Sequence, residues 1–241
     1  AAGYLSHPGY AALPEAPYRY QEMLGVIWRE NPSCYLQDGE QAVLMAALME
    51  TDNDGRPLID AWIKRSGLTA DAWLEKLFEA TVIPFYHLLC RYGVALIAHG
   101  QNVTLVMKDY VPQRILLKDF QGDMRLVDED FPQAQSLPEQ VKAVTARLSA
   151  DYIIHDLQTG NFVTVLRFIS RLTLQCGVSE TRFYQILAQV LRRYMAAHPD
   201  LAARFAKFDL FKPQIIRVIL NPVKLTFSEH DGGNRMLPNY V

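Results

Sequence analysis

A stretch of alternating polar and apolar character, "AHGQNVTLVMKDYVPQRILLKDFQGDMRLV" from Ala98 to Val127, does most to limit the possible folds. It contains two runs rich in Val, Ile and Leu, separated by polar residues around 109–113, and this pattern predicts a β-hairpin over residues 103–120. Polar side chains stand at both ends of the hairpin, where a purely structural sheet has no need of them: His99, Gln101, Asn102 and Asp119.

Helical patterns flank the hairpin on both sides. Residues 38–50 and 69–93 have apolar positions at helical spacing, and Thr69 and Gly93 are suited to begin and end the second of these helices. The fold class is therefore predicted to be α+β, a mostly helical body around a small antiparallel sheet. Further helices are expected at 138–157, 161–177 and 179–199, and short strands at 214–220 and 223–227.

Composition excludes several classes of partner. The 241 residues are 50% apolar, enough for a sizeable core, and 24 basic residues nearly balance 26 acidic ones. This balance leaves no electrostatic footprint for nucleic acid or an anionic membrane, and no apolar run reaches the roughly 18 residues of a membrane span. Three cysteines without close pairing argue against a disulfide framework, and the start lacks the layout of a signal peptide, so a reducing cytoplasm is expected.

The two ends of the hairpin are expected to meet. In the second strand Leu117 and Asp119 share one face, because strand side chains have a period of two, so the Asp119 carboxylate ends an apolar row. A carboxylate in such a place is costly unless a cation or several hydrogen-bond donors meet it. When the strands pair, Asn102 at the start of the first strand lies beside Asp119 at the end of the second.

Two interpretations of these hairpin ends stay open. Amide and carboxylate oxygens side by side are the hard ligands that hold Mg²⁺ between nucleotide phosphates, and a nearby His99 is suited to meet a phosphate or a substrate carboxylate. Alternatively, Asn102 only caps a turn, Asp119 pairs with Lys118 or Arg125, and His99 has no role.

The same segments resemble a known protein family. "LIAHGQN" followed by "LLKDFQG" is similar to the paired signature of the IucA/IucC siderophore synthetases, ATP-dependent enzymes that join citrate- or succinate-type carboxylates to amines without a non-ribosomal peptide assembly line. In that family a His-x-Gln-Asn segment and an (Arg/Lys)-Asp-Phe-x-Gly segment meet at the active site, at a separation that matches this chain. "VIWREN" at 26–31 also resembles a family segment, and the likeness extends over most of the chain.

The resemblance implies a role for each polar residue and implies ATP and Mg²⁺ as cofactors. Catalysis would fall to His99, which contacts phosphate and the substrate carboxylate, and to Asp119. Mg²⁺ would be held by Asp119 together with Asn102. The nucleotide site would be lined by Gln101, Asn102 and Lys118, the last of which stands where the family often has Arg. Independently of the resemblance, Arg125 is a candidate to bind the substrate carboxylate, because it lies a few residues beyond Asp119.

The chain departs from the family pattern in two respects. Ile97 stands where the family commonly has Glu, two residues before the His. Family members are also much longer, and the Ser/Thr-rich loop with which their N-terminal half grips the triphosphate is not found here. The chain is therefore expected to be a C-terminal part that lacks the N-terminal half. Residues 1–37 would form an arm and the end of the nucleotide-binding "fingers", and residues 38–241 a helical "palm" that includes the FhuF-like region.

The implied reaction has two steps. A carboxylate attacks the α-phosphate of Mg·ATP to give an acyl adenylate and pyrophosphate, and an amine, often on a hydroxamate-bearing chain, then displaces AMP to form an amide. The enzyme is expected to be a cytoplasmic homodimer, and the isolated fragment to be inactive or incomplete.

Two alternative functions compete with this one. The His-Gly, Asn and Asp-Phe-x-Gly pattern also resembles the loops of small-molecule kinases, but Gln101 occupies the place of their catalytic Asp. The other alternative is a non-catalytic dimerisation or binding module that has kept the fold. Binding of a metal–nucleotide would distinguish the synthetase from such a module.

Overall fold

A computed structural model describes residues 2–13, 15 and 23–215 of the chain. The chain divides into two compact units, Ala1–Phe208 and Asp209–Val241, and the elements below belong to the first. The strands expected at 214–220 and 223–227 lie outside the described residues, apart from 214–215.

The predicted hairpin is confirmed and forms the centre of a four-stranded sheet. Strands β6 (Val103–Lys108) and β7 (Val111–Leu117) pair antiparallel, with Val103 opposite Leu117. Two more strands complete the order β1-β7-β6-β4: β1 (Ala2–Tyr4), parallel to β7, and β4 (Glu40–Leu44), antiparallel to β6.

The turn of the hairpin is tighter than the sequence suggested. It consists of Asp109 and Tyr110 instead of 109–113, and both residues have positive φ, 50° and 62°. Such left-handed pairs match the right-handed twist of the strands they join, so a two-residue turn lets β7 begin at Val111.

The helix predicted at 38–50 is wrong. Glu40–Leu44 is strand β4, and only Met45–Met49 is helical, as the 3₁₀-helix η2. A short apolar run fits the periodicity of a helix or of a strand. Here the run forms a strand at the edge of β6, because pairing satisfies the backbone hydrogen-bonding groups of both strands. Arg114 of β7 fixes the register by donating to the carboxylate of Glu40.

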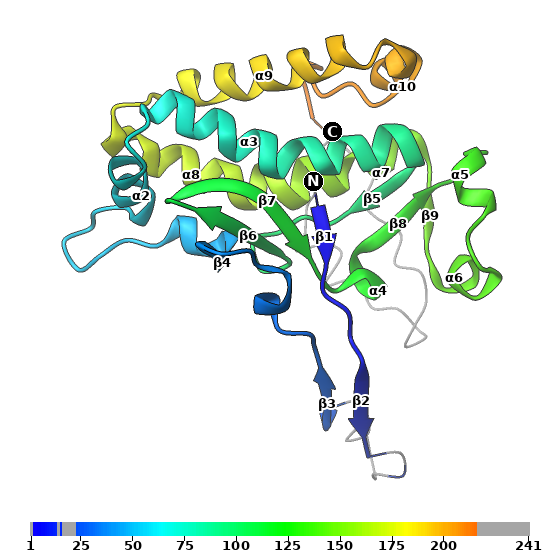
Figure 1. The fold of residues 1–241 in the computed structure, drawn as a ribbon. Helices are drawn as coiled ribbons and strands as arrows, with labels where there is room; N and C mark the ends of the chain where they lie inside the picture. The colour runs from blue at the N-terminus through cyan, green and yellow to red at the C-terminus, as the bar shows by residue number, and fades with distance from the viewer. Residues whose placement is uncertain (1, 14, 16–22, 216–241) are drawn as a thin grey trace, which may run out of the picture. The chain divides into compact units, whose positions relative to one another are not determined.

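Two long helices behave as their caps predict. In α3 (Ala70–His87) the Thr69 hydroxyl accepts from the amide of Ala72 at 3.2 Å, and the helix continues as the π-helix η3 (Leu88–Tyr92) up to Gly93. α9 (Glu180–Ala197) begins at Ser179 in the same way. Figure 1 shows α3 between the sheet and α9, and Trp73 of α3 is fully buried. Among the described residues, no helix is long and apolar enough to cross a membrane.

The helix predicted at 138–157 is interrupted. The chain forms α6 (Glu139–Val144), a two-residue strand β9 (Arg147–Leu148) and then α7 (Ala150–Leu157). β9 leaves the helical path because it pairs with β8 (Met124–Val127), which in turn pairs with β5 (Val94–Leu96), in a second sheet ordered β5-β8-β9.

The remaining elements complete the α+β fold, which confirms the predicted class. Strands β2 and β3 pair only with each other, and their ribbon extends away from the four-stranded sheet (Figure 1). The elements of the first unit that have not yet been given bounds are β2 (Gly9–Ala12), β3 (Gly25–Trp28), η1 (Pro32–Tyr35), α2 (Leu58–Ser66), α4 (Phe120–Asp123), α5 (Pro132–Gln135), η4 (Gln158–Leu166), α8 (Arg167–Leu172), η5 (Thr173–Cys176), η6 (Pro199–Leu201) and α10 (Ala202–Lys207).

Candidate active site

The small sheet brings together the two segments that carry the signature residues. β5 leads into the loop 97–102, and β8 follows directly on the short helix α4. Leu96 of β5 lies opposite Met124 of β8, and the amide of Ile97 donates to the carbonyl oxygen of Asp123 at 2.8 Å. Backbone pairing therefore places the end of α4 against the loop.

Three polar side chains converge where these segments meet. The Nε2 atom of His99 lies 3.5 Å from Oδ2 of Asp123, and the same oxygen accepts a hydrogen bond from the side-chain amide of Asn102. Asn102 is buried, whereas His99 keeps 34% of its side chain exposed. This arrangement leaves the imidazole reachable from solvent and held by a carboxylate on one side.

The loop that carries His99 is fixed from two directions. The Gly100 carbonyl oxygen accepts from the amide of Ala46 in η2 at 3.1 Å, and a Cβ on Gly100 would lie 3.2 Å from the Ala46 backbone. From the other direction, the buried Asn161 of η4 donates its side-chain amide to the carbonyl oxygen of Ala98 at 2.9 Å. Such close contacts of backbone with backbone hold a short loop in one conformation.

Arg125, the predicted ligand of a substrate carboxylate, forms an ion pair with Asp156 of α7. Its Nη1 lies 3.2 Å from Oδ2 of Asp156, whose side chain is only 12% exposed. Burial raises the pKa of the Asp156 carboxyl to about 6, with a smaller contribution from repulsion by Asp123, while Arg125 acts in the opposite direction. Arg125 is therefore already partly neutralised by a protein carboxylate.

Asp119 occupies a different environment from the one expected. β7 ends at Leu117, and Asp119 has a left-handed backbone (φ 63°), so it does not continue the apolar row of the strand. Its carboxylate accepts from Nη2 of Arg29 at 2.6 Å, and Nε2 of His7 lies 3.5 Å away. The side-chain amide of Asn102 is directed to Asp123 instead of Asp119, although the Lys118 amide still donates to the Asn102 carbonyl oxygen at 3.3 Å.

The other two predicted contacts lie close by in sequence and differ in exposure. Lys118 is half-buried, and burial together with the charge of Arg29 lowers the pKa of its ammonium, while Asp119 acts in the opposite direction. Gln101 is exposed in the turn before β6.

The sequence interpretation missed four residues of this region: His7, Arg29, Asp123 and Asp156. Asp123 directly follows the signature "DFQG" and Arg29 stands inside "VIWREN", so both lie in segments that the motif comparison had already marked. His7 and Asp156 carry no local signal, because they reach the region only through tertiary contacts.

The donor set suits a magnesium–nucleotide and does not suit a closed protein cage. Among the described residues, no group of three or more His, Cys, Asp or Glu side chains is arranged to hold a metal ion. Mg²⁺ typically takes one or two carboxylates and completes its shell with phosphate oxygens and water, and Asp119 and Asp123 are carboxylates at the start and the end of α4.

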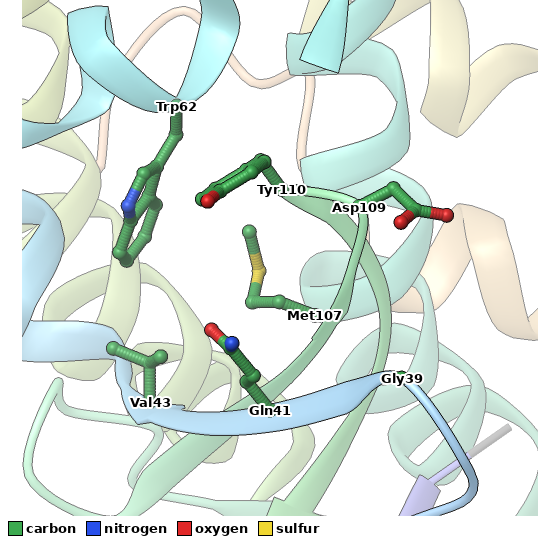
Figure 2. A pocket seen from close by; sticks show the side chains of 7 residues that line it. All are labelled: Gly39, Gln41, Val43, Trp62, Met107, Asp109 and Tyr110. Carbon is green, nitrogen blue, oxygen red and sulfur yellow. The ribbon is translucent and has the colours of Figure 1, made fainter. Parts of the chain in front are cut away.

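A separate hollow of about 170 Å³ lies at the opposite end of the hairpin (Figure 2). Trp62 of α2 and Tyr110 of the turn flank Met107, and Gln41 points toward them from β4, whereas the carboxylate of Asp109 points away. The length of β6, roughly 20 Å at about 3.3 Å per residue, separates this hollow from Asn102. Asp109 is the charged residue among those that line it, and the hollow takes no part in the candidate site.

Comparison with known proteins connects these segments to a family. The FhuF family, described as "Ferric iron reductase FhuF-like transporter", matches residues 71–234, and the IucA/IucC family matches residues 1–50. An aerobactin synthase from Escherichia coli is 68% identical over 241 residues, which are 100% of this chain and 42% of that protein. The rhizobactin siderophore biosynthesis protein RhbF from Rhizobium meliloti is 39% identical over 236 residues, 97% of this chain and 39% of that protein.

A solved structure extends the similarity to the fold. The aerobactin synthetase IucC from a hypervirulent pathotype of Klebsiella pneumoniae matches with a TM-score of 0.86 at 65% identity, over 94% of this chain and 41% of that one. The chain thus spans about two fifths of the length of the relatives that it matches. It belongs to the IucA/IucC family, and the larger part of it is the FhuF-like region of that family.

Proposed function

We propose that the chain is the C-terminal part of an ATP- and Mg²⁺-dependent siderophore synthetase. The complete enzyme adenylates a citrate- or succinate-type carboxylate and condenses it with an amine or hydroxamate-bearing precursor to form an amide. The observation that carries the proposal is the pairing of β5 with β8, which brings both signature segments together in a chain 68% identical to an aerobactin synthase.

Each residue of the site has a task in this proposal. Asp119, with the amide oxygen of Asn102, would hold Mg²⁺, and the ion when bound would supply neutralisation of charge on the phosphates. His99 orients the substrate carboxylate or donates to the phosphate oxygens, and Asp123 holds its imidazole. Gln101 and Lys118 line the nucleotide. Because two anions must approach each other, positioning and charge neutralisation are the main sources of catalysis.

Arg125 is proposed to receive the substrate carboxylate. Burial raises the pKa of its present partner Asp156 to about 6, so this carboxylate loses its charge at a higher pH than an ordinary Asp and then releases the guanidinium. The amine of the second step must be uncharged to attack.

The proposal also covers the organisation of the whole enzyme. Residues 1–37 are the end of the fingers region and residues 38–241 the palm, and the chain works with an N-terminal half that supplies the triphosphate grip. We propose a homodimer in the cytoplasm, a compartment that agrees with the free thiols of Cys34, Cys90 and Cys176. The isolated chain would be inactive in amide formation.

Exchange of labelled pyrophosphate into ATP tests the proposal directly. The complete enzyme is expected to catalyse this exchange only in the presence of the carboxylate substrate and Mg²⁺, because the exchange reverses acyl-adenylate formation. Formation of ADP without exchange would instead identify a kinase. Absence of both activities in the complete, folded protein would leave a non-catalytic module.

The substitution Asp119→Asn gives a first prediction. It is expected to abolish the Mg²⁺-dependent exchange while leaving the fold intact, because it removes the charge that holds the metal and keeps the shape of the side chain. Thermal unfolding and circular dichroism would verify the fold. Full exchange activity in this variant would contradict the assignment of Asp119 to the metal.

A further inference from the structure

The hollow beside the hairpin turn is built from three parts of the chain that are distant in sequence (Figure 2). Gln41 of β4 lies directly opposite Met107 of β6, so their side chains share one face of the sheet. Trp62 of α2 and Tyr110 of the turn flank the same space. Four side chains of different chemistry thus face one hollow.

Tyr110 stands beside this hollow in an unusual backbone conformation. Its φ of 62° is left-handed, which is rare for a large side chain and far easier for glycine. Its carbonyl oxygen accepts from Nε1 of the buried Trp73 at 2.8 Å, and its hydroxyl accepts from Nη1 of Arg65 at 3.1 Å. The ring is therefore fixed in place through both its backbone and its hydroxyl.

The hollow offers surfaces for a flat, uncharged group. Trp62 is half-buried and Tyr110 is 36% exposed, so their rings are covered only in part, whereas Met107 is buried. The exposed Gln41 amide has no hydrogen-bond partner within the described part of the chain, so its donor and its acceptor are both available. Asp109 points its carboxylate away (Figure 2), so the lining residues direct no charge into the hollow.

The size of the hollow limits the ligand further. Its volume of about 170 Å³ corresponds to roughly five or six water molecules at about 30 Å³ each, which is room for one ring system and too little for a complete nucleotide. An aromatic heterocycle is flat enough to stack on Trp62. A Gln amide suits adenine in particular, because its oxygen and its NH₂ group match the N6 donor and the N7 acceptor of that base.

We propose that this hollow binds the base of an adenine nucleoside or nucleotide, at a site separate from the candidate active site. The base stacks on Trp62 above the thioether of Met107, Gln41 bonds to its N6 and N7 atoms, and the ribose stays outside the hollow. The inference does not depend on the proposed function, although an adenylating enzyme would release AMP, which carries this base.

Titration of the 241-residue chain with adenosine, followed by calorimetry, tests the inference. Adenosine carries the base without the phosphates that the candidate active site would bind. Gln41→Ala is expected to weaken binding about fivefold or more, because it removes the paired hydrogen bonds. Gln113→Ala is the matched control, since Gln113 is an exposed glutamine of β7 in the same sheet and should leave binding unchanged. Thermal unfolding of each variant verifies that it folds.

Trp62→Leu gives a second, independent readout. Adenosine should quench the tryptophan fluorescence of the unchanged protein, and this quenching should disappear in the variant, which keeps Trp28 and Trp73. Guanosine presents only acceptors at N7 and O6, so it should bind about fivefold or more weakly than adenosine.

The outcomes separate this inference from the proposed function. Adenosine binding that is weakened in both Gln41→Ala and Trp62→Leu supports the site, whether or not the complete enzyme catalyses pyrophosphate exchange. Absence of adenosine binding, or binding that persists unchanged in both variants, overturns the site, and equal binding of guanosine contradicts the role of Gln41. Loss of pyrophosphate exchange in the complete enzyme with Gln41→Ala would place the hollow in the active site and overturn its separation.

Discussion

Asp123 is the residue on which the geometry of the site depends most. A single oxygen, Oδ2, accepts from the Asn102 amide and faces Nε2 of His99 at 3.5 Å. The carboxylate therefore orients the His99 ring through Nε2, and it turns the Asn102 side chain so that its oxygen faces away from Asp123. Asp123 thus determines the orientation of both the His99 ring and the Asn102 side chain.

The substitution Asp123→Asn tests this role. The new amide still accepts from Asn102 through its oxygen, but that oxygen is neutral toward His99, so the electrostatic attraction that orients the ring is lost. We expect kcat of the complete enzyme to fall about tenfold or more, with KM for ATP changed much less. Steady-state kinetics beside His99→Ala provide the measurement. An equal rise in KM with unchanged kcat would show that Asp123 acts only in binding.

At the scale of elements, the π-helical segment η4 supports the loop of the site. Gly160 of η4 lies against this loop so closely that a Cβ would be 3.0 Å from Cγ2 of Ile97 and 3.3 Å from the amide nitrogen of Ala98. The neighbouring Asn161 holds the Ala98 carbonyl oxygen. A wider helix at this position lets backbone approach backbone, as π-bulges often do at functional sites.

Gly160→Val is expected to disturb this contact. The added atoms have no space between η4 and the loop, so the free energy of unfolding should fall by about 1–3 kcal/mol, and activity should fall through displacement of His99. Gly122→Ala is the matched control, because a Cβ there would meet nothing within 4 Å. Urea unfolding of the two variants would decide the point, and equal stability would contradict the close packing.

Local signals in the sequence predicted the elements whose determinants are local. The cap at Thr69, the stop at Gly93 and the hairpin all depend on residues within a few positions of each other, and the structure confirms them. The motif comparison likewise marked the two loops of the site without any knowledge of the fold.

The rest depends on partners that are distant in sequence. Glu40–Leu44 is a strand because it pairs with the edge of β6. The helix predicted at 138–157 is interrupted because Arg147–Leu148 pairs with β8. The Arg29–Asp119 pair joins residues 90 positions apart, and the left-handed backbone of Asp119 removed it from the face that strand alternation assigned to it. No period or cap encodes such contacts.

For the described unit as a whole, two carboxylates give the stability opposite dependences on pH. Two hydrogen bonds from the Arg114 guanidinium, together with one from the Gln37 amide, lower the pKa of the Glu40 carboxyl to about 2. The contribution of the ionised Glu40 to the free energy of unfolding is fully present above about pH 4.5, the ordinary pKa of the group, and is lost as the pH falls toward 2. Asp156 acts in the opposite sense, because its folded-state pKa of about 6 lies above the ordinary value of 3.8. The folded protein takes up this proton more readily than the unfolded chain, so the free energy of unfolding rises as the pH falls through 6.

Asp156→Asn isolates the second effect. Asparagine resembles the protonated acid, so the variant should be more stable than the unchanged protein at pH 7.5, by no more than about 3 kcal/mol, and the difference should shrink as the pH falls toward 4.5. Urea unfolding between pH 4.5 and 7.5 would measure both curves. Asp151→Asn, at an exposed position of the same helix, should keep the slope of the unchanged protein. Parallel curves for Asp156→Asn and the unchanged protein would mean that the buried carboxylate is not the group that titrates.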